Sequence, residues 1–129
     1  MKINKITINN FKSFDKTEIE FGNVNMIIGV NASGKSNFIQ VFELLKSIQQ
    51  NGVRKAVNDF GGIGALKNYN TNNRSFDLTI EIDIQKEINT EPIDKERYIA
   101  RIRDKVFYEI EFMLKGEYDF QIRENIKFV

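Results

Sequence analysis

The chain has 129 residues, with 19 lysines and arginines against 18 aspartates and glutamates, and it contains no histidine and no cysteine. A net charge of +1 excludes a strongly basic protein that coats polyanions through charge alone. Without cysteine or histidine there can be no disulfide, thiolate zinc site, iron–sulfur cluster or Ser-His-Asp triad. Any bound metal must be a hard cation with oxygen ligands, which favours Mg²⁺.

The length and apolar content predict one folded domain over residues 1–129. Hydrophobic residues make up 41% of the chain, including 11 phenylalanines, and there is a single proline, which argues against disorder. No apolar run approaches the roughly 20 residues of a membrane span, and the start of the chain lacks the apolar region of a signal peptide. We therefore expect a cytosolic protein with no membrane partner.

Two strands are predicted before residue 24. From Lys2 to Phe11, Ile6 and Ile8 alternate with polar residues, as in a half-buried strand. After a short polar connection, Ile19 and Phe21 alternate with glutamates in a second strand, which a Gly-Asn turn closes.

A third strand and a helix are predicted around a glycine-rich loop. Met26-Ile27-Ile28 is a continuous apolar run, as expected of a strand covered on both faces. It leads directly into residues 29–36. Beyond them, apolar residues recur at three- and four-residue spacings, which predicts a helix ending near Gly52: Phe38, Val41, Phe42, Leu45 and Ile48.

The rest of the chain is predicted to be rich in strands. Val53–Phe60 is interpreted as a short helix, and Gly61–Gly64 and Asn68–Asn73 as loops. From Phe76 to Ile84, apolar and polar residues alternate strictly, which predicts the clearest strand of the chain. A turn around Pro92, spanning residues 89–94, precedes one long strand or a hairpin over 97–114 and a further strand over 118–129. We thus expect an antiparallel, strand-rich half over about residues 76–129.

Residues 29–36 carry the motif that points to chemistry. Their sequence, Gly-Val-Asn-Ala-Ser-Gly-Lys-Ser, matches the phosphate-binding pattern G-x-x-x-x-G-K-[ST]. Gly29 and Gly34 permit backbone torsions and close approaches that a Cβ would block. The N–H groups of such a loop, and of the helix that follows it, form a cradle for phosphate oxygens.

Two side chains at the end of the motif have distinct predicted roles. Lys35 would bring a mobile positive charge to the β- and γ-phosphates, and Ser36 would offer its hydroxyl oxygen to Mg²⁺. Lys35 is therefore the candidate catalytic residue and Ser36 the candidate metal ligand. The pattern identifies a bound phosphate chain, and adenine and guanine remain equally compatible with it.

Three stretches of the sequence resemble a known group of proteins. Residues 8–14, 19–22 and 26–38 resemble the N-terminus of ABC-type ATPase heads, in the branch that holds SMC and RecF proteins, OLD-type ATPases and the bacterial AAA-type ATPases grouped with them. Residues 53–84, with Asp-Phe-Gly-Gly before a strand, are similar to the AAA-type group in particular. The resemblance implies a mixed α/β P-loop NTPase fold, in which this chain is the N-terminal lobe with an antiparallel β subdomain.

The resemblance also implies ligands and partners. ATP and Mg²⁺ would be the cofactors, and the full-length protein would pair with a second head and serve DNA or a nuclease partner. Two residues of the Asn-Phe-Lys-Ser stretch, Lys12 and Ser13, would reach the phosphates from an adjacent loop; for Lys12 a solvated turn position is the alternative. The residues that would wrap the triphosphate are Asn31, Ala32, Ser33, Gly34, Lys35, Ser36 and Asn37.

The second half of an ATPase site is missing from the sequence. No apolar strand ends in Asp-Glu, the pair that would support Mg²⁺ and orient the attacking water. No Ser-Gly-Gly-type signature loop or switch histidine is present. We therefore expect an incomplete domain that hydrolyses ATP only once a C-terminal lobe and a second head complete it. An alternative is a nucleotide-dependent assembly module that a partner chain completes in trans; a P-loop kinase is disfavoured by the strand-rich second half.

A row of basic residues in the second half has two possible readings. If residues 97–105 form a strand, Arg97, Arg101, Arg103 and Lys105 share one face. Such a row could contact a phosphate backbone. The sequence favours a solvated strand face instead, because Glu109 and Glu111 continue the same alternation.

Overall fold

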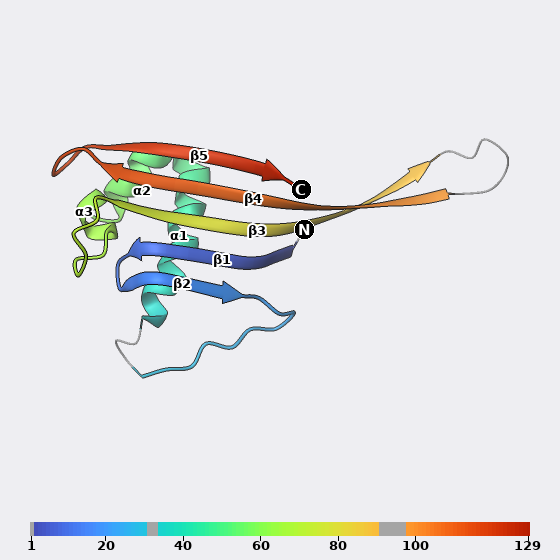
Figure 1. The fold of residues 1–129 in the computed structure, drawn as a ribbon, viewed down its shortest axis with the longest axis horizontal. Helices are drawn as coiled ribbons and strands as arrows, with labels where there is room; N and C mark the ends of the chain where they lie inside the picture. The colour runs from blue at the N-terminus through green and yellow to red at the C-terminus, as the bar shows by residue number, and fades with distance from the viewer. Residues whose placement is uncertain (1, 31–33, 91–97) are drawn as a thin grey trace.

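The computed structural model describes residues 2–30, 34–90 and 98–129. Its centre is a five-stranded sheet with the order β2-β1-β3-β4-β5 (Figure 1). The strands are β1 (Lys2–Phe11), β2 (Phe14–Glu20), β3 (Ser75–Thr90), β4 (Tyr98–Leu114) and β5 (Phe120–Phe128). All four neighbouring pairs are antiparallel. The mixed α/β fold with an antiparallel sheet is therefore confirmed, with β1 and β2 in the same sheet as the strands of the second half.

Strands β3 and β4 form a hairpin that extends beyond its neighbours. Pairing between β1 and β3 ends at the Lys2–Asp83 pair, and pairing between β4 and β5 ends at Val106–Phe128. One step further, Lys105 and Val129 still exchange backbone hydrogen bonds, and from the Ile84–Asp104 pair to the Thr90–Tyr98 pair β3 and β4 pair only with each other among the described residues (Figure 1). The segment over residues 97–114 is thus a single strand of the hairpin, beginning at Tyr98.

Three helices follow one another between β2 and β3 and cover one face of the sheet. They are α1 (Lys35–Asn51), α2 (Val53–Asp59) and α3 (Ile63–Leu66), and α1 crosses behind the strands in Figure 1. Gly52, with φ of 81°, ends α1 and begins α2 in a conformation that L-residues rarely adopt. Both longer helices are confirmed as predicted.

The core lies between α1 and the strand residues that alternate toward it. Val41 and Leu44 of α1 are fully buried, as are Ile6 and Ile8 of β1. In the neighbouring strands the same face presents an aromatic stack, in which the rings of Phe76 and Phe112 lie 4.6 Å apart. The alternation seen in the sequence therefore selects the buried face correctly.

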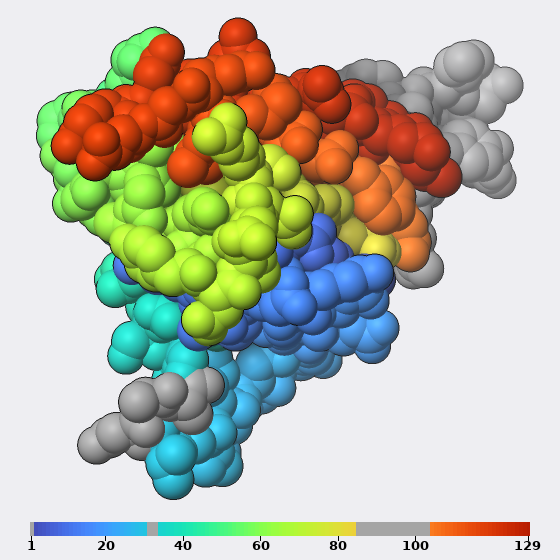
Figure 2. Space-filling model, turned by 60° about the vertical axis from the view of Figure 1, so that its left-hand side comes forward, coloured from blue at the N-terminus to red at the C-terminus, as the bar shows by residue number. Residues whose placement is uncertain are grey.

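The prediction of a buried strand at residues 26–28 is wrong. In the structure this segment forms no strand, and the side chains of Met26, Ile27 and Ile28 are 80%, 50% and 84% exposed. Figure 2 shows the surrounding segment projecting from the body of the molecule. A strand requires a hydrogen-bonded neighbour and cover for its apolar faces, and the described part of the chain supplies neither here.

Two predicted loops are also corrected. Ile63 and Gly64, expected as the end of the loop over Gly61–Gly64, begin the single helical turn α3, because Ile63 and Leu66 are buried and anchor it against the core. The expected turn over residues 89–94 starts later, since Asn89 and Thr90 still pair with β4. Residues 91–97, with Pro92 and Arg97, lie outside the described residues. The Asn-rich stretch 68–73 is confirmed as free of helix and strand apart from a single bridge next to it at Lys67.

Acidic side chains gather on the face of the sheet opposite the helices. Asp77 is half-buried there, and the side-chain amide of Asn9 donates a hydrogen bond to its carboxylate at 2.7 Å. Glu111 lies directly across from it in β4, and Glu109 is the next acid along that strand. Burial raises the pKa of Asp77; the Asn9 hydrogen bond lowers it, and the charges of Glu109 and Glu111 raise it further, with a net upward shift.

No helix in the described part of the chain is long and apolar enough to cross a membrane.

The first prediction concerns the aromatic stack. Phe76 is fully buried, stacks on Phe112 and meets Phe11 edge-on at 5.8 Å. Phe76→Ala should lower the free energy of unfolding by about 3–5 kcal/mol in urea titration. Phe128→Ala is the matched control, because Phe128 is 71% exposed and its removal should cost about 0.5 kcal/mol or less. Equal losses for the two variants would contradict the packing.

The second prediction concerns Asp77. A raised carboxyl pKa means that the folded protein prefers the protonated acid, so Asp77 favours folding below its ordinary pKa and opposes it once ionised. Asp77→Asn should therefore raise the melting temperature at pH 7, and the gain should vanish as the pH falls below about 4. Asp83→Asn is the control, since the Asp83 charge attracts Lys105 and its removal should give no gain. A pH-independent effect of Asp77→Asn would count against this explanation.

Candidate functional site

The N-terminus of α1 has the electrostatics of an anion site. Gly34 caps the helix at φ 93°, in the left-handed region, and no side chain caps it among the described residues. The first turn contains no acidic residue. Since the first N–H groups of a helix have no partner within it, and the helix dipole is positive at this end, the site favours a negatively charged ligand.

Lys35 folds back over the loop that precedes the helix. Its ammonium donates hydrogen bonds to the carbonyl oxygens of Gly29 and, at 2.6 Å, of Val30. These contacts keep the positive charge beside the loop, at the helix end where the N–H groups emerge. Oxygens of a phosphate group are the kind of acceptor that could take the place of these carbonyls.

The turn between β1 and β2 lies against the same helix end. The Asn37 side chain donates a hydrogen bond to the Ser13 hydroxyl at 2.8 Å. A Cβ at Gly34 would stand 3.3 Å from the same hydroxyl oxygen and 3.8 Å from the Phe14 ring. The structure therefore brings Ser13 to the end of the predicted loop at Gly34, although the two residues are far apart in the chain.

The backbone of this turn and of the end of β1 is unusual. Asn10 has φ of 55° and Lys12 has φ of 48°, and both are positive-φ residues without being glycine. The Lys12 N–H donates to the Leu66 carbonyl at 2.9 Å, so the turn is tied to α3. Positive φ in non-glycine residues persists only where the surroundings hold it, and such strain gathers at functional sites.

Asn68 holds this turn from the other side, and the sequence interpretation missed it. Its backbone N–H donates to the Asn10 carbonyl at 2.7 Å, and its side-chain amide donates to the Phe14 carbonyl at 3.1 Å. The side-chain oxygen accepts the Asn70 N–H at 2.9 Å. Asn68 lies in a run of asparagines that indicates only a loop, so no signal in the sequence singles it out.

The remaining predicted residues separate into those near the helix end and those that cannot be placed. Gly34 and Asn37 lie beside Ser13 at the start of α1, with Lys35 and Ser36 between them, and Gly29 accepts a hydrogen bond from Lys35. Asn31, Ala32 and Ser33 lie outside the described residues. No group of three or more acidic side chains in the described part of the chain is arranged to hold a metal ion.

The basic row of β4 does not form a free cationic surface where it can be described. Lys105 donates a hydrogen bond to Glu81 across the strands at 2.9 Å. Arg101 and Arg103 belong to β4, but their side chains lie outside the described residues. At Lys105, therefore, the prediction of a solvated strand face is confirmed, and the charge of Lys105 is paired with that of Glu81.

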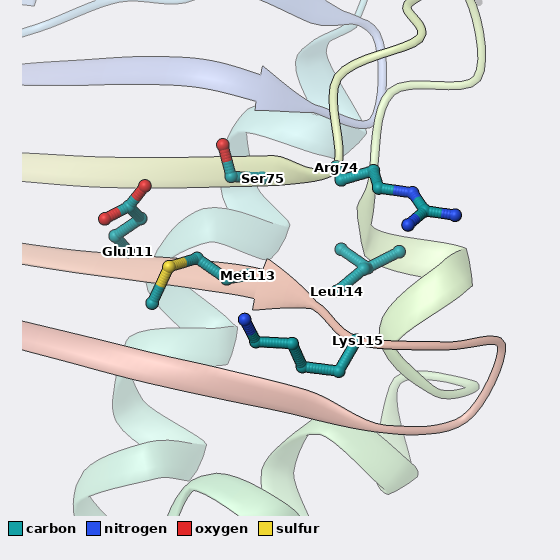
Figure 3. A pocket seen from close by; sticks show the side chains of 6 residues that line it. All are labelled: Arg74, Ser75, Glu111, Met113, Leu114 and Lys115. Carbon is teal, nitrogen blue, oxygen red and sulfur yellow. The ribbon is translucent and has the colours of Figure 1, made fainter.

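A hollow of about 420 Å³ opens where β3 begins and β4 ends. Figure 3 shows that its polar groups do not converge, because the Arg74 guanidinium points away from Glu111. The carboxylate of Glu111 is engaged by Arg123 at 3.4 Å. The hollow is lined by Arg74, Ser75, Glu111, Met113, Leu114 and Lys115. The N-terminus of α1, rather than this hollow, is the better candidate site.

Comparison with known families gives a match over nearly the whole chain. A family model described as an AAA ATPase domain matches residues 1–127. The chain is 32% identical over 117 residues to the DNA double-strand break repair Rad50 ATPase of Saccharolobus solfataricus, covering 88% of this chain and 13% of that protein.

Other relatives are also much longer than this chain. The DNA replication and repair protein RecF of Bacillus thuringiensis is 34% identical over 94 residues, which cover 67% of this chain and 24% of RecF. Endonuclease GajA of Bacillus cereus is 41% identical over 58 residues, or 43% of this chain and 10% of the endonuclease. The chain thus spans a quarter or less of the length of these relatives.

A solved structure shares the fold. It comes from work on ATP-driven dimerization and DNA-stimulated activation of SMC ATPases, and it matches with a TM-score of 0.52 at 22% identity. The match covers 95% of this chain and 71% of the other. At this level of identity the comparison establishes the arrangement of helices and strands.

The geometry of Gly34 yields a prediction. Because its φ is 93° and an added Cβ would crowd the Ser13 hydroxyl, Gly34→Ala should lower the free energy of unfolding by about 1–2 kcal/mol. Gly64→Ala is the control: Gly64 lies within α3, an added Cβ meets nothing within 4 Å, and alanine should stabilise by about 0.5–1 kcal/mol. Denaturant titration of both variants measures the difference. A stabilising Gly34→Ala would contradict the left-handed conformation.

Proposed function

This chain belongs to the AAA ATPase domain family, and we propose that it is the Mg-ATP-binding N-terminal lobe of an ABC-type ATPase head. The observation that carries the proposal is the loop 29–36, which leads into an uncapped helix N-terminus with Lys35 folded over it. The fold shared with an SMC ATPase structure supports the same assignment.

Each residue of the proposed site has a physical role in holding the nucleotide. The N–H groups at the start of α1 would donate to phosphate oxygens, and Lys35 would exchange its carbonyl partners for the β- and γ-phosphates. Ser36 would supply a hydroxyl oxygen to Mg²⁺, which when bound neutralises charge on the phosphates. Asn31, Ala32, Ser33 and Asn37 would complete the wrapping of the triphosphate, and Lys12 and Ser13 would approach it from the β1–β2 turn.

We further propose that hydrolysis requires parts that residues 1–129 do not supply. Most acids of the described β3 and β4, including the half-buried Asp77 with Glu109 and Glu111, lie on the face of the sheet opposite the helices, and Asp104 is exposed. The acidic motif that orients water would come from a C-terminal lobe, and a second head would close over the nucleotide. The exposed apolar run Met26-Ile27-Ile28 supports this view, because a strand of another segment could pair with it and cover it.

The same exposed run is compatible with completion by a separate chain. In that case the protein would be an assembly module that uses nucleotide as a switch. Co-purification of a second polypeptide carrying the acidic motif and signature loop would favour this form. The names of the relatives, which concern DNA repair, replication and an endonuclease, make DNA and a nuclease the partners that we propose for the complete protein.

The proposal predicts nucleotide binding that depends on Lys35. The 129-residue chain should bind Mg-ATP, and Lys35→Ala should weaken binding at least about tenfold, because a charge-assisted contact to phosphate is lost. Lys46→Ala is the control, since Lys46 is an exposed residue of the same helix further along. Isothermal titration calorimetry measures both.

A second measurement separates binding from catalysis. The isolated chain should hydrolyse ATP negligibly in a phosphate-release assay. Robust turnover that disappears in Lys35→Ala would contradict the requirement for further parts, whereas equal ATP affinity of wild type and Lys35→Ala would contradict the assignment of the loop.

A further inference from the structure

We propose that Asn68 is a positioning residue for the nucleotide site: it holds the strained β1–β2 turn against the N-terminus of α1, and thereby sets where Lys12 and Ser13 meet the phosphates. The inference rests on the proposed function, because it gives the turn a role only if the helix end binds a phosphate chain. Asn68 acts through the turn and is not assigned a contact with the ligand.

Asn68 is the buried polar residue of the described core. It is 3% exposed, and it is the single polar residue among the buried residues of that part of the chain. An asparagine buried to this degree is costly unless its amide is satisfied. Here the amide is satisfied on both sides, since Nδ2 donates to the Phe14 carbonyl and Oδ1 accepts the Asn70 N–H.

The contacts of Asn68 bracket the turn. Its backbone N–H binds the carbonyl of Asn10, before the turn, and its side chain binds the carbonyl of Phe14, after the turn. Between them lies Lys12, held in the left-handed region. Because such a conformation survives only when neighbours over-determine it, removing one of these ties should let the turn relax.

A change in the conformation of the turn would directly alter the proposed nucleotide site. Ser13 accepts the hydrogen bond from Asn37 in the first turn of α1, and its hydroxyl lies beside Gly34. A shift of the turn would therefore move Ser13 and Lys12 relative to the helix end. The path from Asn68 to α1 is short: Asn68 binds the Phe14 carbonyl, the backbone joins Phe14 to Ser13, and Asn37 of α1 donates to the Ser13 hydroxyl.

The side chain at position 68 donates a hydrogen bond to the Phe14 carbonyl and accepts one from the Asn70 N–H, and an amide can do both. Asn68→Asp keeps the size of the side chain and the acceptor for Asn70, but at neutral pH it replaces the donor to the Phe14 carbonyl with a carboxylate oxygen, which repels that carbonyl. Asn70→Ala is the matched control: the Asn70 side chain is exposed, and alanine keeps the backbone N–H that Asn68 accepts.

The decisive experiment is a mutant cycle read out by Mg-ATP affinity. Asn68→Asp should weaken binding about fivefold to tenfold in the wild-type background, and Asn70→Ala should change it less than about twofold. In a Lys12→Ala, Ser13→Ala background, Asn68→Asp should have less than about a twofold effect, because the groups that it positions are gone. If Asn68→Asp does not fold, Asn68→Ala replaces it with the same expected ratios, because alanine removes both side-chain hydrogen bonds and keeps the backbone N–H that binds the Asn10 carbonyl.

The outcomes separate positioning from general stability. Equal weakening in both backgrounds would overturn the proposal, as would an Asn68→Asp protein that binds like wild type or a Lys12→Ala, Ser13→Ala protein that binds ATP undiminished. Ile110→Val should lower the melting temperature without weakening ATP binding, because Ile110 is buried in β4. Lys35→Ala, titrated in parallel, tests the nucleotide site itself, so that failure of the site is distinguished from failure of the positioning role.

Discussion

Helix α1 packs across the sheet through Val41 and Leu44, and this contact decides where the N-terminus of the helix can lie. Both side chains are fully buried, so the helix cannot slide or turn without exposing apolar surface. Its first turn then falls beside the β1–β2 turn, and the loop 29–36 must end there. The electrostatics of the site, an uncapped helix end with Lys35 folded over the loop, follow from this placement.

The β1–β2 turn shows how the same packing tolerates strain. Two residues with positive φ, Asn10 and Lys12, occur within three positions of the chain. Backbone ties from α3 and from Asn68 hold them. The energy of those ties offsets the strain, and the result is a rigid turn at the mouth of the proposed site. Rigidity at this point suits a site that must present several groups to a phosphate chain at once.

The apolar run at residues 26–28, unlike the apolar residues of the core, is exposed. A core segment of this composition is normally covered, and here it lies on the surface of the described chain. The relatives are at least four times as long as the segment that matches them, as the 24% coverage of RecF shows. Its exposure is therefore consistent with a surface that meets another part of a larger head, which is the arrangement that we propose.

The local spacing of apolar residues was sufficient to predict most of the strands and helices. The alternation of Ile6 and Ile8 in β1 and the strict alternation in β3 predicted both strands, because a strand places successive side chains on opposite faces. The spacing of Phe38, Val41 and Leu45 predicted α1, and the motif itself identified Lys35 and Ser36. The family resemblance supplied Lys12 and Ser13, of which Ser13 lies at the predicted helix end.

Long-range contacts decided the rest. The run at 26–28 has the composition of a buried strand, but pairing depends on a neighbour, and no local pattern reveals whether one exists. The join of β1 to β3, the single turn of α3 and the burial of Asn68 likewise depend on residues far away in the chain. The sequence specified which residues could bind phosphate, because that chemistry is local to a loop and a helix end. Only the tertiary structure showed what holds them in place, because the turn, α3 and the Asn68 amide meet through packing that no single segment encodes.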